Sequence, residues 1–146
     1  MKNVLELLER TAARLPRQTA FADQQCSYDY QTVVNIAESV GSALAANGDR
    51  NCPVAVLMER GAPCLVTLMG VLYSGNFYVV LDPEMPAERV NKILRTLQPT
   101  VLICDEAHKD DPAGLDYDGK VYSAEALAAG QAQPELLQTV RRRMID

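Results

Sequence analysis

The segment Asp105-Glu106-Ala107-His108 carries side chains that could do chemistry, and it directly follows the apolar run Val101–Cys104. Acidic residues at the end of a buried strand can hold the magnesium ion of a bound nucleotide. That chemistry also requires a phosphate-binding loop of the form GxxxxGK(S/T). The one Gly-Lys pair of the chain, Gly119-Lys120, is followed by Val121. We therefore predict that residues 105–108 form a solvated exit from a strand.

The other reactive side chains lack the partners that catalysis requires. His108 has no matched nucleophile for a catalytic triad. Asp82, Glu84 and Glu88 are close in sequence and could do acid–base work, but a turn at Asp82-Pro83 and a helix N-terminus account for them. We therefore assign no catalytic, cofactor-binding or metal-binding residue within 1–146. The serines, none of which lies in a GxSxG elbow, are Ser27, Ser39, Ser42, Ser74 and Ser123.

The cysteines are too dispersed to indicate a metal site or a disulfide framework. Cys26, Cys52, Cys64 and Cys104 form no CxxC pair, and the chain has one histidine. Zinc binding would need clustered ligands. Cys64 and Cys104 have apolar neighbours in the sequence, where a thiol behaves as a small hydrophobic group. We predict that the thiols are buried or idle.

Composition excludes several classes of function. Of the 146 residues, 48% are hydrophobic and 23% charged, which is ordinary for one globular domain. Lys and Arg number 14 against 19 Asp and Glu, a net charge of −5, so binding to nucleic acid or to an anionic membrane lacks an electrostatic driving force. The basic run Arg141–Arg143 is expected to be a solvated helix end.

No apolar stretch approaches a membrane span, and residues 1–10 do not form a signal peptide, so we predict a cytoplasmic location.

Hydrophobic periodicity predicts helices that alternate with strands. Asn3 is a candidate N-cap for the first helix, which Pro16 ends. The predicted elements are a helix over 4–15, a hairpin over 19–30, a helix with an apolar face from Val33 to Leu44, a strand over 53–58, a helix over 62–73, a strand over 77–81, a helix from Pro86 to Leu97, a strand over 100–104, a short strand over 120–122, a helical turn after Ser123 and a helix over 134–145. This alternation predicts an α/β fold with a doubly wound, mainly parallel sheet flanked by helices.

Two of these elements are expected to be the most buried. The helix over 62–73 is apolar almost all round, which requires burial. The strand over 77–81 is a continuous apolar run, which is typical of a strand covered on both faces in a parallel sheet. The chain stops directly after its last helix without a closing strand, so we interpret residues 1–146 as a single, truncated domain.

The segment from Leu72 to Pro83 resembles the second core motif of amino-acid adenylation domains. It reads LYSGNFYVVLDP where the motif is LKAGxAYVP(I/L)DP, and residues 86–90, PAERV, follow at the family spacing and are similar to YPxER(I/L). Upstream, residues 29–44 resemble the first motif, (T/S)YxELxxxAxxxAxxL, and residues 48–56 resemble the GDxVA strand between the two motifs. The resemblance covers about residues 3–106. The departures are Thr32 for Glu, Tyr73-Ser74 for Lys-Ala, and Val80 for Pro.

The resemblance implies a place in the superfamily of acyl- and aminoacyl-adenylate-forming enzymes, which includes nonribosomal peptide synthetases and D-alanine–carrier-protein ligases. Such an enzyme uses ATP and magnesium to form aminoacyl-AMP and pyrophosphate, and then passes the acyl group to a carrier-protein thiol. By this resemblance the phosphate loop, the ribose-binding Asp and the catalytic Lys would all follow Asp146. We therefore expect residues 1–146 to bind no cofactor, to be inactive alone, and to pack against the remainder of the domain.

If the chain is part of a larger domain, the surface that meets the remainder should be apolar, and exposed apolar patches promote self-association. The alternative reading is a complete, small flavodoxin-like α/β module that binds a ligand or a partner. A downstream sequence with a Thr-Ser-Gly-rich, Lys-bearing loop would favour the enzyme, and a stop codon after Asp146 would favour the module.

Overall fold

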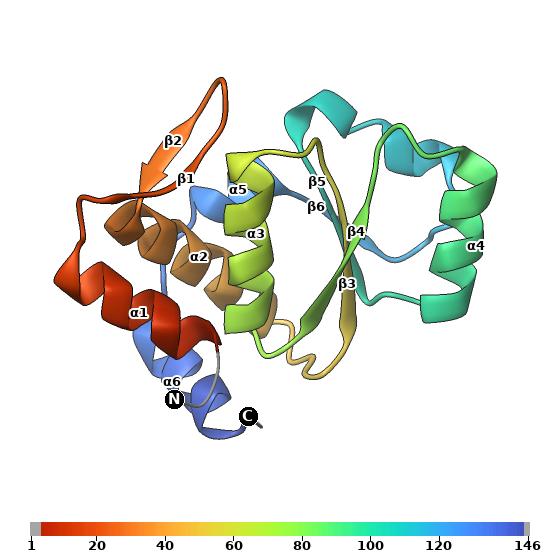
Figure 1. Ribbon diagram of the computed structural model, residues 1–146. Coiled ribbons are helices and arrows are strands. Elements are labelled where there is room, and N and C mark those ends of the chain that lie inside the picture. Colours follow the sequence, from red (N-terminus) through yellow and green to blue (C-terminus); the bar gives the residue numbers. More distant parts are fainter. Residues whose placement is uncertain (1–3, 145–146) are drawn as a thin grey trace.

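A four-stranded, fully parallel sheet forms the centre of the computed structural model, which describes residues 4–144 (Figure 1). The strand order is β4-β3-β5-β6, so the chain crosses from β3 outward to β4 and then back over β3 to β5. This reversal confirms the predicted doubly wound, parallel arrangement. The strands are β3 (Pro53–Leu57), β4 (Phe77–Leu81), β5 (Val101–Cys104) and β6 (Lys120–Ser123).

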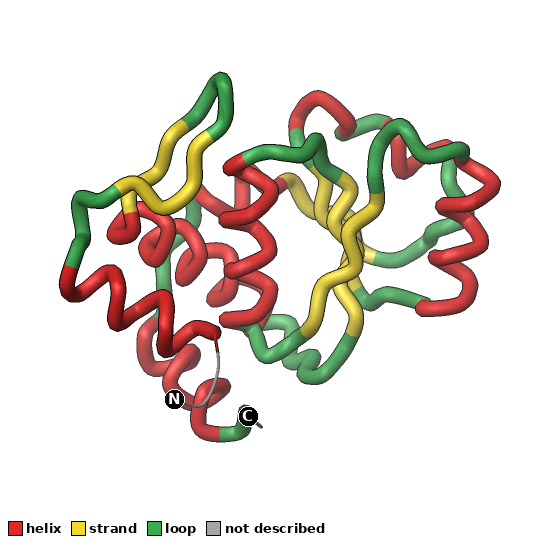
Figure 2. Tube along the Cα trace, viewed as in Figure 1, coloured by secondary structure: helices red, strands yellow, loops and turns green. Residues whose placement is uncertain are grey.

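Helices cover both faces of the sheet, and Figure 2 shows the two helical layers with the strands between them. On one face α2 (Tyr30–Ala45), α3 (Ala62–Tyr73) and α5 (Ala124–Ala128) pack against Val54, Val56, Val101 and Ile103. On the other face α4 (Ala87–Leu97) packs against Ala55, Leu57 and Leu102. Two 3₁₀ turns, η1 (Glu106–His108) and η2 (Asp111–Gly114), connect β5 to β6.

A second group of elements packs on the far side of α2 and α3. It consists of α1 (Val4–Arg14), α6 (Pro134–Arg142) and the antiparallel hairpin of β1 (Thr19–Ala22) and β2 (Ser27–Asp29). Leu5 and Leu8 of α1, and Leu137 of α6, share one hydrophobic cluster with α2 and α3. The antiparallel pairing of β1 with β2 confirms the predicted hairpin over 19–30. The predicted N-cap Asn3 and the predicted helix end Ile145 lie outside the described residues, and α6 itself ends at Arg142.

The prediction that residues 77–81 are among the most buried is wrong. All four residues of β5 are buried, and so are four of the five residues of β3, whereas β4 exposes Phe77, Tyr78 and Val80. β4 lies at the edge of the sheet and has a neighbour on one side only. An apolar run therefore identified a strand but did not distinguish an edge strand from a central one.

The helix α3 is buried almost all round, as its composition predicts. Only Leu65 among its large apolar side chains is exposed, at 43%. Two glycines let α2 and α3 approach closely: a Cβ at Gly41 would lie 2.5 Å from the Cβ of Tyr73, and one at Gly70 would lie 2.5 Å from the Cβ of Val40. Any larger side chain at either position would push the two helices apart.

The β1–β2 hairpin supplies the N-terminal cap of α3. The helix begins after Gly61, which has no side chain to accept a hydrogen bond. Asp23 of the hairpin replaces it, because its Oδ2 accepts the backbone N–H of Ala62 at 2.7 Å while its Oδ1 accepts the N–H of Cys26 at 2.7 Å. These hydrogen bonds lower the pKa of Asp23. One carboxylate thus fixes the hairpin turn and docks it on the helix.

A charged group links α1, α3 and α6. Arg141 donates to Glu9 at 3.1 and 3.0 Å, the hydroxyl of Tyr73 donates to the same carboxylate at 2.7 Å, and the guanidinium lies 5.4 Å from the Tyr73 ring centroid. Burial alone would raise the pKa of Glu9, but hydrogen bonds from Arg141 and Tyr73 outweigh it and hold the pKa below its ordinary value. The prediction of a solvated basic run is therefore wrong for Arg141, although Arg142 and Arg143 are exposed.

We predict different costs for two alanine substitutions on α3. Leu68→Ala should lower the free energy of unfolding by about 2–5 kcal/mol, because it leaves a cavity in the core beneath the sheet. Leu65→Ala, on the exposed side of the same helix, should cost less than about 1 kcal/mol. Urea denaturation of both variants measures the difference, and equal costs would show that the buried side of α3 is misassigned.

Candidate functional site at the carboxyl edge of the sheet

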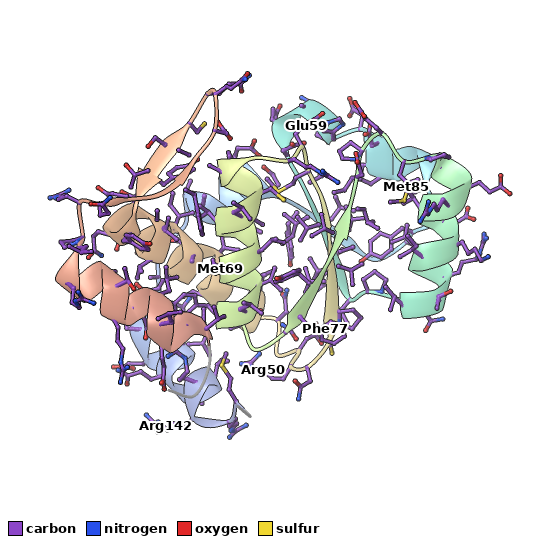
Figure 3. All side chains as sticks on the ribbon, in the orientation of Figure 1. Arg50, Glu59, Met69, Phe77, Met85 and Arg142 are labelled. Carbon is purple, nitrogen blue, oxygen red and sulfur yellow. The ribbon has the colours of Figure 1, made fainter. Side chains whose placement is uncertain are left out.

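A ligand site is expected in this architecture at the carboxyl ends of the parallel strands, which we call the carboxyl edge of the sheet. In open α/β sheets, ligands bind outside the carboxyl ends of the strands, at the point where the strand order reverses. Here that point lies between β3 and β5. Glu59 follows β3 and Asp105 follows β5. Figure 3 places Glu59 at this end of the molecule, and Phe77 and Arg50 at the opposite end.

Four polar residues at this edge, Glu59, Asp105, His108 and Asp111, form what we call the carboxyl-edge clasp. Asp105 Oδ2 accepts the backbone N–H of Glu59 at 3.0 Å, and Asp105 Oδ1 accepts the backbone N–H of His108 at 3.2 Å. The His108 ring lies between two carboxylates, with Nε2 at 2.8 Å from Glu59 Oε1 and Nδ1 at 2.9 Å from Asp111 Oδ2. The clasp therefore ties the ends of the two central strands together.

The clasp favours the protonated form of His108. The hydrogen bond to Glu59 raises the pKa of His108 above its ordinary value, and the bond to Asp111 adds to this against the effect of partial burial. A doubly protonated ring donates from both nitrogens, which matches a ring that lies between two carboxylates.

The predicted solvated exit over residues 105–108 holds for only two of its four residues. Glu106 and Ala107 are exposed, and Glu106 pairs with Lys109 at 2.9 Å. Asp105 and His108 are instead held in the clasp. The sequence did not show this arrangement because Glu59, which contacts both residues, is more than forty positions away along the chain.

A hollow of about 230 Å³ lies beside the clasp, between the ends of β3 and β4 and the first turn of α4. Asp82 and Asp111 line it together with apolar side chains, and no Lys, Arg or His is among the residues that line it. Asp82 accepts the backbone N–H of Glu84 at 2.9 Å, and Glu88 lies in the first turn of α4, so the predicted turn and helix N-terminus are confirmed. The two carboxylates would repel the phosphates of a nucleotide.

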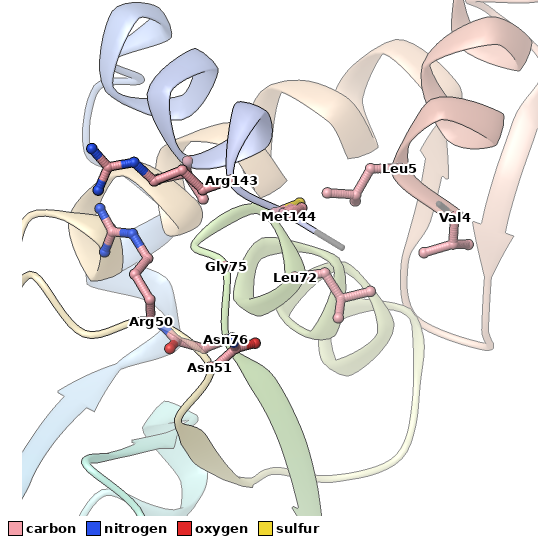
Figure 4. A pocket seen from close by; sticks show the side chains of 10 residues that line it. Val4, Leu5, Arg50, Asn51, Leu72, Gly75, Asn76, Arg143 and Met144 are labelled. Carbon is pink, nitrogen blue, oxygen red and sulfur yellow. The ribbon is translucent and has the colours of Figure 1, made fainter. Parts of the chain in front are cut away.

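A cavity of about 420 Å³ lies at the opposite end of the sheet, between α1, α3 and α6. Its walls include Leu5, Leu72 and Met144, and Figure 4 shows the guanidinium groups of Arg50 and Arg143 together on the other side, away from these apolar side chains. Arg50 already donates to the carbonyl oxygens of Ala45 and Asp49, at 3.1 and 2.7 Å. The cavity thus has an apolar wall formed by the helices and two arginines at its other side.

The motif segment 72–83 builds the turn that leads from α3 into β4. The buried hydroxyl of Ser74 donates to the carbonyl of Val71 at 2.6 Å and accepts from Asn76 Nδ2 at 3.0 Å. Asn76 Oδ1 in turn accepts the backbone N–H of Cys52, just before β3, at 3.0 Å. These side chains connect α3, β4 and β3, so the motif positions strands here.

The glycine of the motif is required by backbone conformation and by space. Gly75 has a φ of +81°, in the left-handed region that other residues rarely adopt. A Cβ at this position would lie 2.8 Å from Val140 Cγ1 of α6 and 3.1 Å from Arg50 Cδ. Gly75 therefore permits both the turn into β4 and the close packing of α6 against it.

The cysteines make no disulfide bond. All four cysteines are free, and Cys64 and Cys104 are buried as predicted, which raises the pKa of both thiols. Among residues 4–144, no group of three or more His, Cys, Asp and Glu side chains is arranged to hold a metal ion. No helix in this described part of the chain is both long enough and apolar enough to cross a membrane.

Comparison with known proteins identifies one family. Residues 8–143 match the AMP-binding enzyme family. A plipastatin synthase from Bacillus subtilis (strain 168) is 27% identical over 135 residues, which is 92% of this chain and 4% of that protein. Bacitracin synthase 3 from Bacillus licheniformis is 30% identical over 115 residues, which is 77% of this chain and 2% of that protein. The chain thus spans a small part of the relatives it matches.

Solved structures of adenylate-forming enzymes share the fold. The nonribosomal peptide synthetase FmoA3 in its α-methyl-L-serine-AMP-bound form superimposes with a TM-score of 0.77 and 22% identity, over 86% of this chain and 14% of that chain. This likeness establishes the arrangement of helices and strands, which agrees with the α/β fold described above.

We predict that His108 titrates above its ordinary pKa of about 6.5. Because the folded-state pKa is raised, the clasp contributes stability below that ordinary value, and the contribution is lost as pH rises through the folded-state pKa. His108→Gln should therefore destabilise the protein more at pH ~5.5 than at pH ~8.5.

Nuclear magnetic resonance titration of the single imidazole measures this pKa directly. Glu59→Gln should lower it, because the hydrogen bond to Glu59 is the largest cause of the raised pKa. Lys109→Gln, a substitution outside the clasp that removes a positive charge, should not lower it. An imidazole pKa at or below the ordinary value, or one that Glu59→Gln leaves unchanged, would contradict the geometry of the clasp.

Proposed function

This chain belongs to the AMP-binding enzyme family, and from that premise we propose that it forms the N-terminal part of an amino-acid adenylation domain. The observation that carries the proposal is the family match over residues 8–143 together with relatives that are peptide synthetases. The segment Leu72–Pro83, with its left-handed Gly75 and the turn at Asp82, supports it as an ordered motif at a defined place in the fold.

The complete enzyme would join an amino acid to ATP, with magnesium, to give aminoacyl-AMP and pyrophosphate, and would then form a thioester with a carrier protein. A site for ATP needs several backbone N–H donors and a cation that converge on the phosphates. The hollow at the carboxyl edge offers two carboxylates instead, and the imidazole of His108 is held by Glu59 and Asp111. The lining of this hollow therefore does not suit the phosphates of a nucleotide.

We infer that residues 1–146 act as the scaffold of the adenylation domain and contribute no catalytic, cofactor-binding or metal-binding residue. The β3–β5 pair, the motif turn and the clasp at the carboxyl edge fix the arrangement of strands and helices in this part of the domain. The groups that bind ATP and carry out amino-acid activation would lie in the remainder of the enzyme.

We predict that the 146-residue chain alone shows no saturable heat with Mg–ATP in calorimetry. The transition-state stabilisation that ATP cleavage requires is supplied by preorganised donors and cations, and the lining of the carboxyl-edge hollow has no cation. A longer polypeptide that contains this segment and the remainder of the domain should catalyse amino-acid-dependent exchange between ATP and pyrophosphate.

The two arms of this experiment fail in different ways. Micromolar ATP binding by residues 1–146 would place a nucleotide site within this segment and would favour Asp105–His108 as part of it. Absence of exchange with every amino acid tested, in a longer polypeptide that is shown to be folded, would contradict the proposed adenylation activity.

A further inference from the structure

The edge strand β4 presents an uncovered, apolar surface. Phe77, Tyr78 and Val80 are exposed by 46, 38 and 44%. Figure 1 shows β4 at the front of the sheet, between α3 and α4, with β5 and β6 behind it. An exposed edge strand with large apolar side chains is a template for pairing with another strand.

The free backbone groups of this edge belong to Tyr78 and Val80. The N–H of Phe77 donates to the carbonyl of Cys52 at 3.1 Å, on the β3 side, and Phe77 to Leu81 pair with Pro53 to Leu57 in parallel register. In a parallel ladder alternate residues face the same neighbour, so Val79 also faces β3. The N–H and C=O groups of Tyr78 and Val80 therefore face away from the sheet.

The chain lacks at β4 the devices that usually protect an edge. Lys, other charged residues and Pro block edge pairing, and β4 contains none of them, whereas the other edge strand, β6, begins with Lys120. At position 80 the adenylation motif has Pro, which has no N–H to donate. Val80 restores that donor and adds an exposed β-branched side chain suited to strand pairing.

We propose that β4 pairs with β4 of a second copy of this chain, in antiparallel orientation, about a two-fold axis at Val79. Centring the pair there places Tyr78 opposite Val80 of the second copy, and these are the residues whose backbone groups face outward. Each such pair exchanges two hydrogen bonds, and the aromatic and β-branched side chains meet on one face of the sheet. The four-stranded sheets of the two copies would become one eight-stranded sheet.

Charge complementarity supports a second copy as the occupant. The carboxyl end of β4 is acidic, because Asp82 and the exposed Glu84 follow the strand. The amino end is basic, because Arg50 lies beside Gly75, just before the strand. An antiparallel pair brings the acidic end of each copy next to the basic end of the other. By symmetry this attraction occurs at both ends of the strand pair. It offsets part of the repulsion between two chains that each carry a net charge of −5.

Sedimentation equilibrium of the 146-residue chain tests the proposal. We expect a monomer–dimer equilibrium whose dissociation constant rises about tenfold or more in Val80→Pro, because that substitution removes one interchain hydrogen bond from each copy. Val80→Thr is the matched control, since Thr is also β-branched and keeps the N–H, and it should retain most of the dimer. Circular dichroism and a thermal melt establish that each variant is folded.

Amide hydrogen exchange supplies the second measurement. The amides of Tyr78 and Val80 should exchange more slowly as the protein concentration rises, while the amide of Val121 on the β6 edge should not change. A monomer at the highest soluble concentration, or a dimer that Val80→Pro leaves intact, would overturn the proposal. Concentration-independent protection of both amides in a monomer would also overturn it, because another segment of the same chain would then cover the edge.

Discussion

The structure depends on covering both faces of the central strands β3 and β5. One face of these strands must be covered because it carries Val54, Val56, Val101 and Ile103. The other must be covered because it carries Ala55, Leu57, Leu102 and Cys104. α2 and α3 meet the first requirement and are held close by Gly41 and Gly70, and α4 meets the second. The large apolar side chains that this buries supply most of the favourable free energy of folding. The polar contacts then select one arrangement of the layers.

Those polar contacts lie mostly at the ends of elements. Asp23 docks the hairpin on α3, Ser74 and Asn76 connect α3 with β4 and β3, and the carboxyl-edge clasp joins the exits of β3 and β5. The motif residues Ser74 and Asn76 thus serve to connect neighbouring elements. The departures from the motif fit the same view, because Tyr73, which replaces a lysine, is buried and hydrogen-bonded to Glu9.

Sequence patterns predicted the elements well and their neighbours less well. The helical period, the turn residues and the apolar runs gave the order of helices and strands and the parallel α/β class. Edge and central strands could not be distinguished, because Phe77–Leu81 is as apolar as Val101–Cys104 and only strand order separates them. The clasp and the Glu9–Arg141 pair were missed, because their members are far apart in sequence and carry no local pattern. Interactions of this kind follow from the tertiary fold.

The central claim is that the motif residues of this segment act by positioning strands. Asn76→Ala in a polypeptide that contains the whole domain tests it most directly, with Asn35→Ala on the exposed side of α2 as the control. We predict that Asn76→Ala lowers the free energy of unfolding by about 1–3 kcal/mol, because it leaves the backbone N–H of Cys52 without its acceptor. The KM for ATP of the molecules that remain folded should be unchanged. Unchanged stability together with a raised KM for ATP would contradict the claim, because Asn76 would then act on the nucleotide.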